Sequence, residues 1–139
     1  MSMVHDNVIT SYIADFENEQ LVLKTVYYHN GVISENTDVI FKSYFTHMFN
    51  NEFKGSIIFD IEECSLNHLI ENERELIEDN RNYCWPIVYK TDNATLELSE
   101  FIQKNGYKIF DINSSYGLHG WVISKDIEFI VTEIVSSKI

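Results

Sequence analysis

Two runs of β-forming residues near the start of the chain restrict its fold more than any other feature. The runs cover residues 8–16 and 20–29 and are rich in Val, Ile, Leu, Thr and Tyr. Residues 17–19 break the pattern between them, and Asn30-Gly31, a pair favoured in tight hairpin turns, follows the second run. We therefore expect consecutive antiparallel strands here.

Alternating apolar residues extend this strand pattern over residues 37–49 and 56–62. In the first segment the alternation predicts one core-facing side, made of Val39, Phe41, Phe45 and Phe49. The opposite side is predicted to hold Lys42, Tyr44 and Thr46. In the second segment one face is predicted to hold Ile57, Phe59 and Ile61, and the other Ile58, Asp60 and Glu62.

Two later segments have helical spacing. The first begins after Ser65, a good N-cap residue, and runs to about Asn80, with its apolar residues at Leu66, Leu69, Ile70, Leu76 and Ile77. The second covers about residues 92–105 and ends before Gly106, as expected of a glycine that follows a helix, with its apolar residues at Leu98, Phe101 and Ile102.

Strands predicted at residues 107–113 and 121–132 close the chain. The order is a block of strands, two helices and further strands, without regular alternation of strand and helix. This order favours an α+β fold with a mainly antiparallel sheet and two helices packed on it. A length of 139 residues suits a single domain covering 1–139.

The charge balance restricts the partners. The chain has 22 acidic and 10 basic residues, a formal net charge of −12. Nucleic acids and anionic membranes require clustered Lys and Arg, so neither is expected as a partner, and a basic protein fits better. No apolar run is long enough to span a bilayer and the N-terminus lacks signal-peptide features, which predicts a cytoplasmic protein.

Few residues are arranged for catalysis or metal binding. Cys64 and Cys84 are 20 residues apart without a CxxC pair, so we expect two reduced thiols. Asp60, Glu62, Glu63 and His68 lie close in sequence but lack the spacing of a calcium loop. We therefore expect no cofactor, no metal site and no enzymatic activity.

Residues 115–121, SYGLHGW, allow two interpretations. The favoured one is a tight turn between two strands, with Tyr116 and Trp121 as core or rim residues. The alternative is the lining of a small pocket in which His119 acts as an acid or base near neutral pH.

Residues 70–80, IENERELIEDN, carry five carboxylates and one arginine. Glu71 with Glu75 and Glu75 with Asp79 are like-charge pairs four residues apart, each of which costs about 0.2 to 0.5 kcal/mol. Glu78 and Asp79 also lie in the last turn, where the helix dipole favours cations. Acidity that served only solubility would avoid these penalties by spreading out.

The acidic residues are concentrated in one part of the chain. Residues 60–79 hold eight acidic residues and one basic residue, which is −7 of the formal −12. We interpret this cluster as a docking surface for a basic partner, and the alternative is a helix face that is simply solvated. Two aromatic residues just beyond the helix are candidate anchors, and the alternative for them is burial in the core. The predicted partner-binding residues are Asp60, Glu62, Glu63, Glu71, Glu75, Glu78, Asp79, Tyr83 and Trp85.

Several segments resemble small acidic bacterial proteins associated with contact-dependent and polymorphic toxin immunity. They are IIFDIEE at 57–63, NYCWPIVYK at 82–90 and GYKIFDINSSYGLHGWVISKD at 106–126. The resemblance implies an immunity protein, or antitoxin, that neutralises a cognate toxin. Together with the acidity, it suggests a basic nuclease domain as the toxin, occluded at its active site. The matching segments carry over no catalytic residues.

Two other classes of function stay open on the sequence alone. A small-molecule or peptide-binding module would use residues 115–121 and a concave sheet face. A small enzyme would use His119, or Cys84 activated by a histidine.

Overall fold

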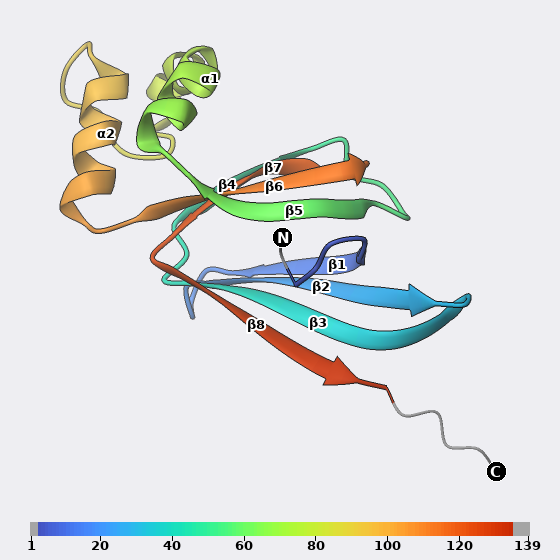
Figure 1. Cartoon of the computed structure of the whole chain (residues 1–139). Helices are drawn as coiled ribbons and strands as arrows, with labels where there is room; N and C mark the ends of the chain where they lie inside the picture. The colour runs from blue at the N-terminus through green and yellow to red at the C-terminus, as the bar shows by residue number, and fades with distance from the viewer. Residues whose placement is uncertain (1–2, 135–139) are drawn as a thin grey trace.

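The structure is a computed structural model that describes residues 3–134 (Figure 1). Its order of elements confirms the expected α+β fold, with eight described strands in one antiparallel sheet and two α-helices. The strands are β1 Val8–Asp15, β2 Gln20–His29, β3 Val32–Lys42, β4 Thr46–Asn50, β5 Ile57–Cys64, β6 Lys108–Tyr116, β7 His119–Ser124 and β8 Asp126–Glu133. The helical elements are α1 Leu66–Asp79, the short 3-10 helix η1 Arg81–Tyr83, and α2 Ala94–Lys104.

The sheet folds over into two layers (Figure 1). Its strand order is β4-β7-β6-β5-β1-β2-β3-β8, with the first four strands in one layer and the last four in the other. The layers are joined where β1 meets β5, through backbone hydrogen bonds from Ile9 N to Ser56 O at 2.8 Å and from Ile58 N to Asn7 O at 2.9 Å.

At the opposite corner the chain crosses between layers twice, from β3 to β4 and from β7 to β8. Ser43 has a positive φ of 50°, and Tyr44 N donates to Glu19 O at 2.8 Å. The prediction of one continuous strand over residues 37–49 is therefore wrong. Tyr44 is buried between the layers, whereas Phe45 packs on Phe101 of α2 at 5.0 Å between ring centroids.

The alternation predicted for β5 is also wrong. Its pairing with β6 shifts register around Ile58 and Asp60, so Phe59 is 54% exposed. Ile58 and Ile61, which strict alternation assigned to opposite faces, are both buried in the core between the layers. A bulge places an extra residue in one strand and changes which side chains face inward.

Two apolar clusters hold the fold together. The cluster between the layers includes Leu21, Leu23, Val39, Phe41, Ile58, Phe110, Ile112 and Val122. The second cluster lies where the helices cover the outer face of the β4-β7-β6-β5 layer, and it includes Leu69, Ile70, Ile77, Leu98, Ile102, Ile109, Trp121 and Ile123. Val39 and Phe41 are thus confirmed as core residues.

Local capping signals explain why both helices begin and end where the sequence predicts. The Ser65 hydroxyl accepts a hydrogen bond from His68 N at 3.1 Å and caps α1. The Asn93 side chain accepts from Leu96 N at 3.2 Å and caps α2, which Gly106 follows with a φ of 72°. Within residues 3–134, neither helix combines the length and apolar character needed to cross a membrane.

Candidate functional site

The solvent-facing side of α1 carries four carboxylates. The buried stripe of this helix is formed by Leu69, Ile70 and Ile77, and successive residues turn by about 100° around the axis. That rotation places the other side of the helix in solvent. Glu71, Glu75 and Asp79 are exposed there, and Glu78 is half-buried beside them. We call these four residues, Glu71, Glu75, Glu78 and Asp79, the acidic face.

The nearby arginines are directed away from the acidic face. Arg74 Nη1 lies 3.4 Å from Thr95 Oγ1 on α2, and Arg81 Nη2 lies 3.7 Å from Asp92 Oδ1. Among the ion pairs of residues 3–134, none includes a carboxylate of the acidic face. Its negative charge is therefore not neutralised within the described part of the chain.

The two helices differ in how their charged residues are placed relative to the helix dipole. In α2 the acidic Glu97 lies in the first turn and the basic Lys104 in the last turn, the arrangement that stabilises a helix. In α1 the first turn has no acidic residue and the last turn has no basic residue. Glu78 and Asp79 occupy that last turn instead, so the charges of α1 oppose its dipole by about 0.3 to 1 kcal/mol each.

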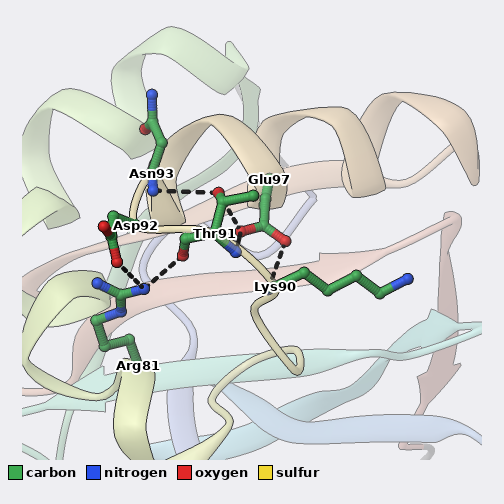
Figure 2. A network of polar contacts seen from close by, with 6 residues as sticks. All are labelled: Arg81, Lys90, Thr91, Asp92, Asn93 and Glu97. Atoms are coloured by element: carbon green, nitrogen blue, oxygen red, sulfur yellow. Dashed lines mark hydrogen bonds and ion pairs between the residues drawn. The ribbon is translucent and has the colours of Figure 1, made fainter.

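A polar network fixes the segment that leads from η1 to α2 (Figure 2). The Glu97 carboxylate accepts hydrogen bonds from Lys90 N at 2.8 Å, Thr91 N at 2.8 Å and Thr91 Oγ1 at 2.7 Å. These bonds, the one from Lys90 N above all, lower the pKa of Glu97. Arg81 donates to the Thr91 carbonyl from the other side. The network thereby anchors the chain just beyond the acidic face.

The two predicted aromatic anchors lie in different environments. Tyr83 on η1 is 80% exposed, so its ring is available to a partner. Trp85 is half-buried and packs against Trp121, with ring centroids 6.1 Å apart. Part of the Trp85 side chain is therefore packed against the helix-covered core.

The predicted strand acids adjoin the start of α1. Glu62 and Glu63 are exposed on the last residues of β5, and Asp60 is half-buried earlier in the strand. The acidic face extends toward the far end of α1, whose 14 residues span about 20 Å. The fold thus gathers the four helix acids on one surface and leaves the three strand acids at the other end of the helix.

A cleft of about 200 Å³ opens between the start of α1 and the helix-covered face of the sheet. Among its lining residues, His68 Nε2 lies 3.4 Å from Asp111 Oδ2, and Asn72 Nδ2 lies 3.0 Å from His68 Nε2. His119 and Trp121 line it from β7.

The turn predicted over residues 115–121 is shorter than expected, because β6 continues to Tyr116 and β7 begins at His119, which leaves only residues 117–118 between the strands. The single strand predicted over residues 121–132 is likewise divided into β7 and β8.

The cleft holds polar groups in a partly buried setting. Burial raises the pKa of the Glu73 carboxyl, the Trp121 indole N–H acts against that rise, and Asp111 adds to it. Trp121 is only 6% exposed, and no acceptor in the described chain meets its Nε1 in hydrogen-bond geometry. Within residues 3–134 no three acidic, histidine or cysteine side chains are grouped so as to hold a metal ion.

Two sequence signals point to this cleft, although sequence reasoning missed them. Glu73 is four residues from both Leu69 and Ile77, which places a carboxylate on the buried stripe of α1. Phe110 faces the core between the two layers, so the next residue of β6, Asp111, faces the helices instead. A charged side chain on a covered face is a recognisable sign of a polar site.

The two cysteines lie in different surroundings. Both thiols are unpaired. Burial, with a further contribution from Asp111, raises the pKa of Cys64 to about 12, so this thiol is protonated and a poor nucleophile at neutral pH. Cys84 is exposed just after η1 and is not part of the cleft lining.

Comparison of the chain with family models, with curated proteins and with solved structures gives no match. What the acidic face and the cleft can do therefore follows from their own charges and contacts.

Proposed function

We propose that this protein is a cytoplasmic immunity protein that binds a basic bacterial toxin and occludes its active site with the acidic face. The observation that carries this proposal is the set of four carboxylates on the solvent side of α1, none of which is in an ion pair with another residue of the described segment 3–134. The resemblance of three segments to toxin-immunity proteins supports the same class. In this role the protein acts by binding and needs no catalytic group.

The energetic cost of the acidic face favours docking over solubility. Glu71 with Glu75 and Glu75 with Asp79 are one helical turn apart, and each pair costs about 0.2 to 0.5 kcal/mol. The reversed charges at the C-terminal turn add to this cost. The same net charge distributed over the sheet would keep the protein soluble without either penalty. A basic partner would turn both penalties into favourable interactions.

The mechanism is electrostatic and steric. A nuclease needs clustered Lys and Arg to neutralise the phosphates of its substrate. A row of helix carboxylates can occupy that cluster and exclude the substrate. Complementary charge accelerates the encounter, while an exposed aromatic such as Tyr83 adds contact area that slows dissociation.

A charge-neutralised variant tests the proposal directly. The substitutions are Glu71→Gln, Glu75→Gln, Glu78→Gln and Asp79→Asn, which keep side-chain size. The free protein should be as stable as before or slightly more so. Its association with a basic nuclease domain encoded beside its gene should be slower and should depend less on salt, because ionic strength screens the steering that the variant lacks. Stopped-flow association rates at low and moderate salt measure both effects.

A matched control separates local charge from net charge. Four glutamates of the other sheet layer and its turns, changed to Gln, give the same change in net charge; they are Glu17, Glu19, Glu35 and Glu133. This control should keep nearly all of the association rate. Equal rates and equal salt dependence in both variants would show that the acidic face is only solvated.

Protection in cells provides a second, independent test. Expression of the protein in the cytosol should protect bacteria against one cognate toxin and leave them sensitive to unrelated toxins. The charge-neutralised variant should lose protection at toxin doses that the control variant survives. A screen of toxins encoded beside related genes that finds no protection would contradict the immunity function.

A further inference from the structure

The two ends of the sheet differ in how easily another strand can pair with them. β4 and β8 are the outermost strands of the described sheet. β4 has only five residues, and short edge strands discourage further pairing. β8 has eight residues, all paired with β3 without a register shift, so its other edge is long and regular. In Figure 1 β8 lies at the rim of the molecule, with β3 beside it on one side only.

The composition of β8 also suits pairing. Its sequence is DIEFIVTE, with β-branched and aromatic residues in the middle and no proline or basic residue. The core-side positions of residues 127–131 are all apolar. Ile130 is 44% exposed and Val131 36% exposed. Natural sheets protect their edges with proline, lysine, bulges or inward-pointing charges. Over residues 126–133 β8 has none of these, which makes it the edge most suited to a further strand.

Backbone hydrogen bonds at the two ends of the β3–β8 ladder show which residues face the open edge. Ile134 N donates to Ser34 O at 2.9 Å, and Lys125 N donates to Lys42 O at 3.0 Å. Both acceptors are even-numbered residues of β3, and backbone direction alternates along a strand. Even-numbered residues of β8 therefore bond to β3. The backbone groups that point to the open edge belong to the odd-numbered residues Ile127, Phe129 and Val131.

A second copy of β8 fits this edge in antiparallel orientation about a twofold axis. An axis at Phe129 would place that residue opposite itself. Ile127 would then lie opposite Val131 of the second copy on the core side of the sheet. Aromatic and β-branched cross-strand pairs of this kind stabilise sheets. The open N–H and C=O groups of all three residues would be paired across the axis.

The same register keeps the acidic residues of the two strands apart. Glu128 would lie opposite Ile130 of the second copy, and Asp126 would lie opposite a threonine. Glu133 would lie opposite Lys125, a residue of the opposite charge. In this register no carboxylate of residues 126–133 faces a carboxylate of the second copy.

Neighbouring registers are less favourable. An axis one or two residues before Phe129 would place Glu128 opposite itself or opposite Asp126. Like charges directly opposite each other destabilise a strand pair. An axis one or two residues after Phe129 would place Glu133 opposite an apolar residue on the core side. Charge and burial therefore both favour the axis at Phe129.

We propose that β8 pairs with β8 of a second copy of this chain in the Phe129-centred register, which joins two β1-β2-β3-β8 layers into one continuous sheet. One strand pair is a small interface, so the dissociation constant of the dimer should lie in the micromolar range. The acidic face belongs to α1, which covers the other layer, so it stays accessible in the dimer (Figure 1). The dimer is independent of the proposed toxin binding, and either proposal stands if the other fails.

Sedimentation velocity over protein concentrations from about 1 to 500 µM measures the association. A salt concentration of about 0.15 M screens the repulsion between copies of net charge −12 to roughly 8 Å. A reducing agent prevents disulfides between the free cysteines. The mean mass should rise from monomer toward dimer over this range and fall again on dilution. A monomer at every concentration would overturn the proposal.

Substitutions of Ile130 test the register. Because this exposed side chain lies opposite Glu128 of the second copy, Ile130→Lys should tighten the dimer and Ile130→Glu should weaken it. The contact occurs twice in a symmetric dimer, so each change should alter the dissociation constant by about two- to thirtyfold. Ile13→Lys and Ile13→Glu are the controls, since Ile13 is 56% exposed on β1 and the changes in net charge are the same. The control pair should differ much less.

A proline tests the open backbone groups. Val131→Pro removes an N–H from the open edge and leaves the bonds to β3 in place, a position that edge strands tolerate. Val131→Ala is its control, because it also shortens the side chain but keeps the N–H. Val131→Pro should abolish the dimer, and Val131→Ala should weaken it only modestly. Melting curves of both variants verify that they are folded, and the Ile130 pair tests the edge without altering the backbone.

The other outcomes contradict the proposal. Equal effects of the Ile130 and Ile13 substitutions would mean that the copies associate through another surface. A dimer that is weakened by both Ile130→Lys and Ile130→Glu would place this residue opposite itself, which excludes the Phe129-centred register. A dimer that persists in folded Val131→Pro would show that the open backbone groups of β8 are not used.

Discussion

Three buried polar residues show how side-chain hydrogen bonding operates inside the two-layered sheet. Asn7 Nδ2 donates to Thr25 Oγ1 at 2.9 Å, and that hydroxyl donates to Thr37 O at 2.8 Å across β2 and β3. The Thr37 hydroxyl is fully buried and has no hydrogen-bond partner among residues 3–134. The hydroxyls of these two neighbouring threonines therefore differ in their hydrogen bonding, and we expect them to differ in their contribution to stability.

Substitution by valine should separate the two threonines. Thr25→Val leaves the Asn7 amide without an acceptor and should lower the free energy of unfolding by about 1 to 3 kcal/mol. Thr37→Val replaces an unpartnered hydroxyl by a methyl group, so that free energy should stay unchanged or rise by up to about 1 kcal/mol. Urea unfolding of both variants measures the difference. Equal losses would mean that the Thr37 hydroxyl does form a stabilising bond.

Glu73 provides a pH-dependent prediction. Burial raises the pKa of its carboxyl from the ordinary value of 4.5, so the fold disfavours the ionised form. The stability contributed by the protonated form is present below the unfolded pKa and is lost as pH rises through the higher, folded pKa. Glu73→Gln should therefore be more stable than the wild type at neutral pH, with an advantage that shrinks toward pH 4.5 and below.

The measurement is the free energy of unfolding at a series of pH values above and below 4.5. Glu71→Gln is the control, because Glu71 lies on the exposed side of the same helix. That variant should leave the pH dependence of the wild type in place. A Glu73→Gln protein with the same pH profile as the wild type would contradict the assigned cost of burying this carboxylate.

Among the elements, the ribbon formed by β3–β4 and β7–β8 determines how the sheet closes over its core. β3 pairs with β8 and β4 with β7, and the ribbon bends where Lys125 N donates to Lys42 O at 3.0 Å. Just beyond the bend, Gly120 approaches β4 so closely that an added Cβ would lie 1.9 Å from Met48 O. Only a residue without a side chain fits there.

Gly120→Ala should consequently push β4 away from β7. We expect a loss of about 2 to 4 kcal/mol in the free energy of unfolding, because the clash is with backbone and cannot be relieved by a rotamer change. Gly31→Ala is the control: this glycine lies in the β2–β3 turn with a φ of 77° and no atom near the added Cβ. It should cost only about 1 to 2 kcal/mol. Thermal and urea unfolding of both variants would show whether the close approach at Gly120 exists.

Over the whole molecule, charge is unevenly distributed. The formal net charge is −12, and the ion pairs that offset it on the β1-β2-β3-β8 layer, Lys24–Asp38 and Lys42–Glu128, are partly exposed. Exposed pairs of this kind contribute about 0 to 1 kcal/mol each. Repulsion among the remaining carboxylates is therefore the larger electrostatic effect on stability.

Salt should then stabilise the free protein. Raising ionic strength from about 0.01 to 0.15 M shortens the screening length from roughly 30 to 8 Å and weakens this repulsion. The melting temperature should rise by a few degrees, equivalent to about 1 kcal/mol. The charge-neutralised acidic-face variant should show a smaller rise, measured by calorimetry at both salt concentrations. A melting temperature that falls with salt would mean that ion pairs dominate over repulsion.

The sequence by itself determined the features that depend on neighbours within a few residues. The Ser65 and Asn93 caps set the helix starts, and the Asn30-Gly31 turn joins β2 to β3. Capping and turn formation need only local hydrogen bonds and backbone preferences, so residue types suffice to predict them. The α+β class and the exposure of most of the acidic face follow from the same local periodicity.

Only the tertiary structure decided which of these elements meet. The bend after Ser43 and the bulge at Phe59 reassign Tyr44 and Ile58 to the buried core, because closing two sheet layers over one core overrides strict alternation. His68 and Asp111 are far apart in sequence and come within 3.4 Å only when α1 packs on β6. Such contacts depend on the packing of whole elements, and no local pattern encodes that packing.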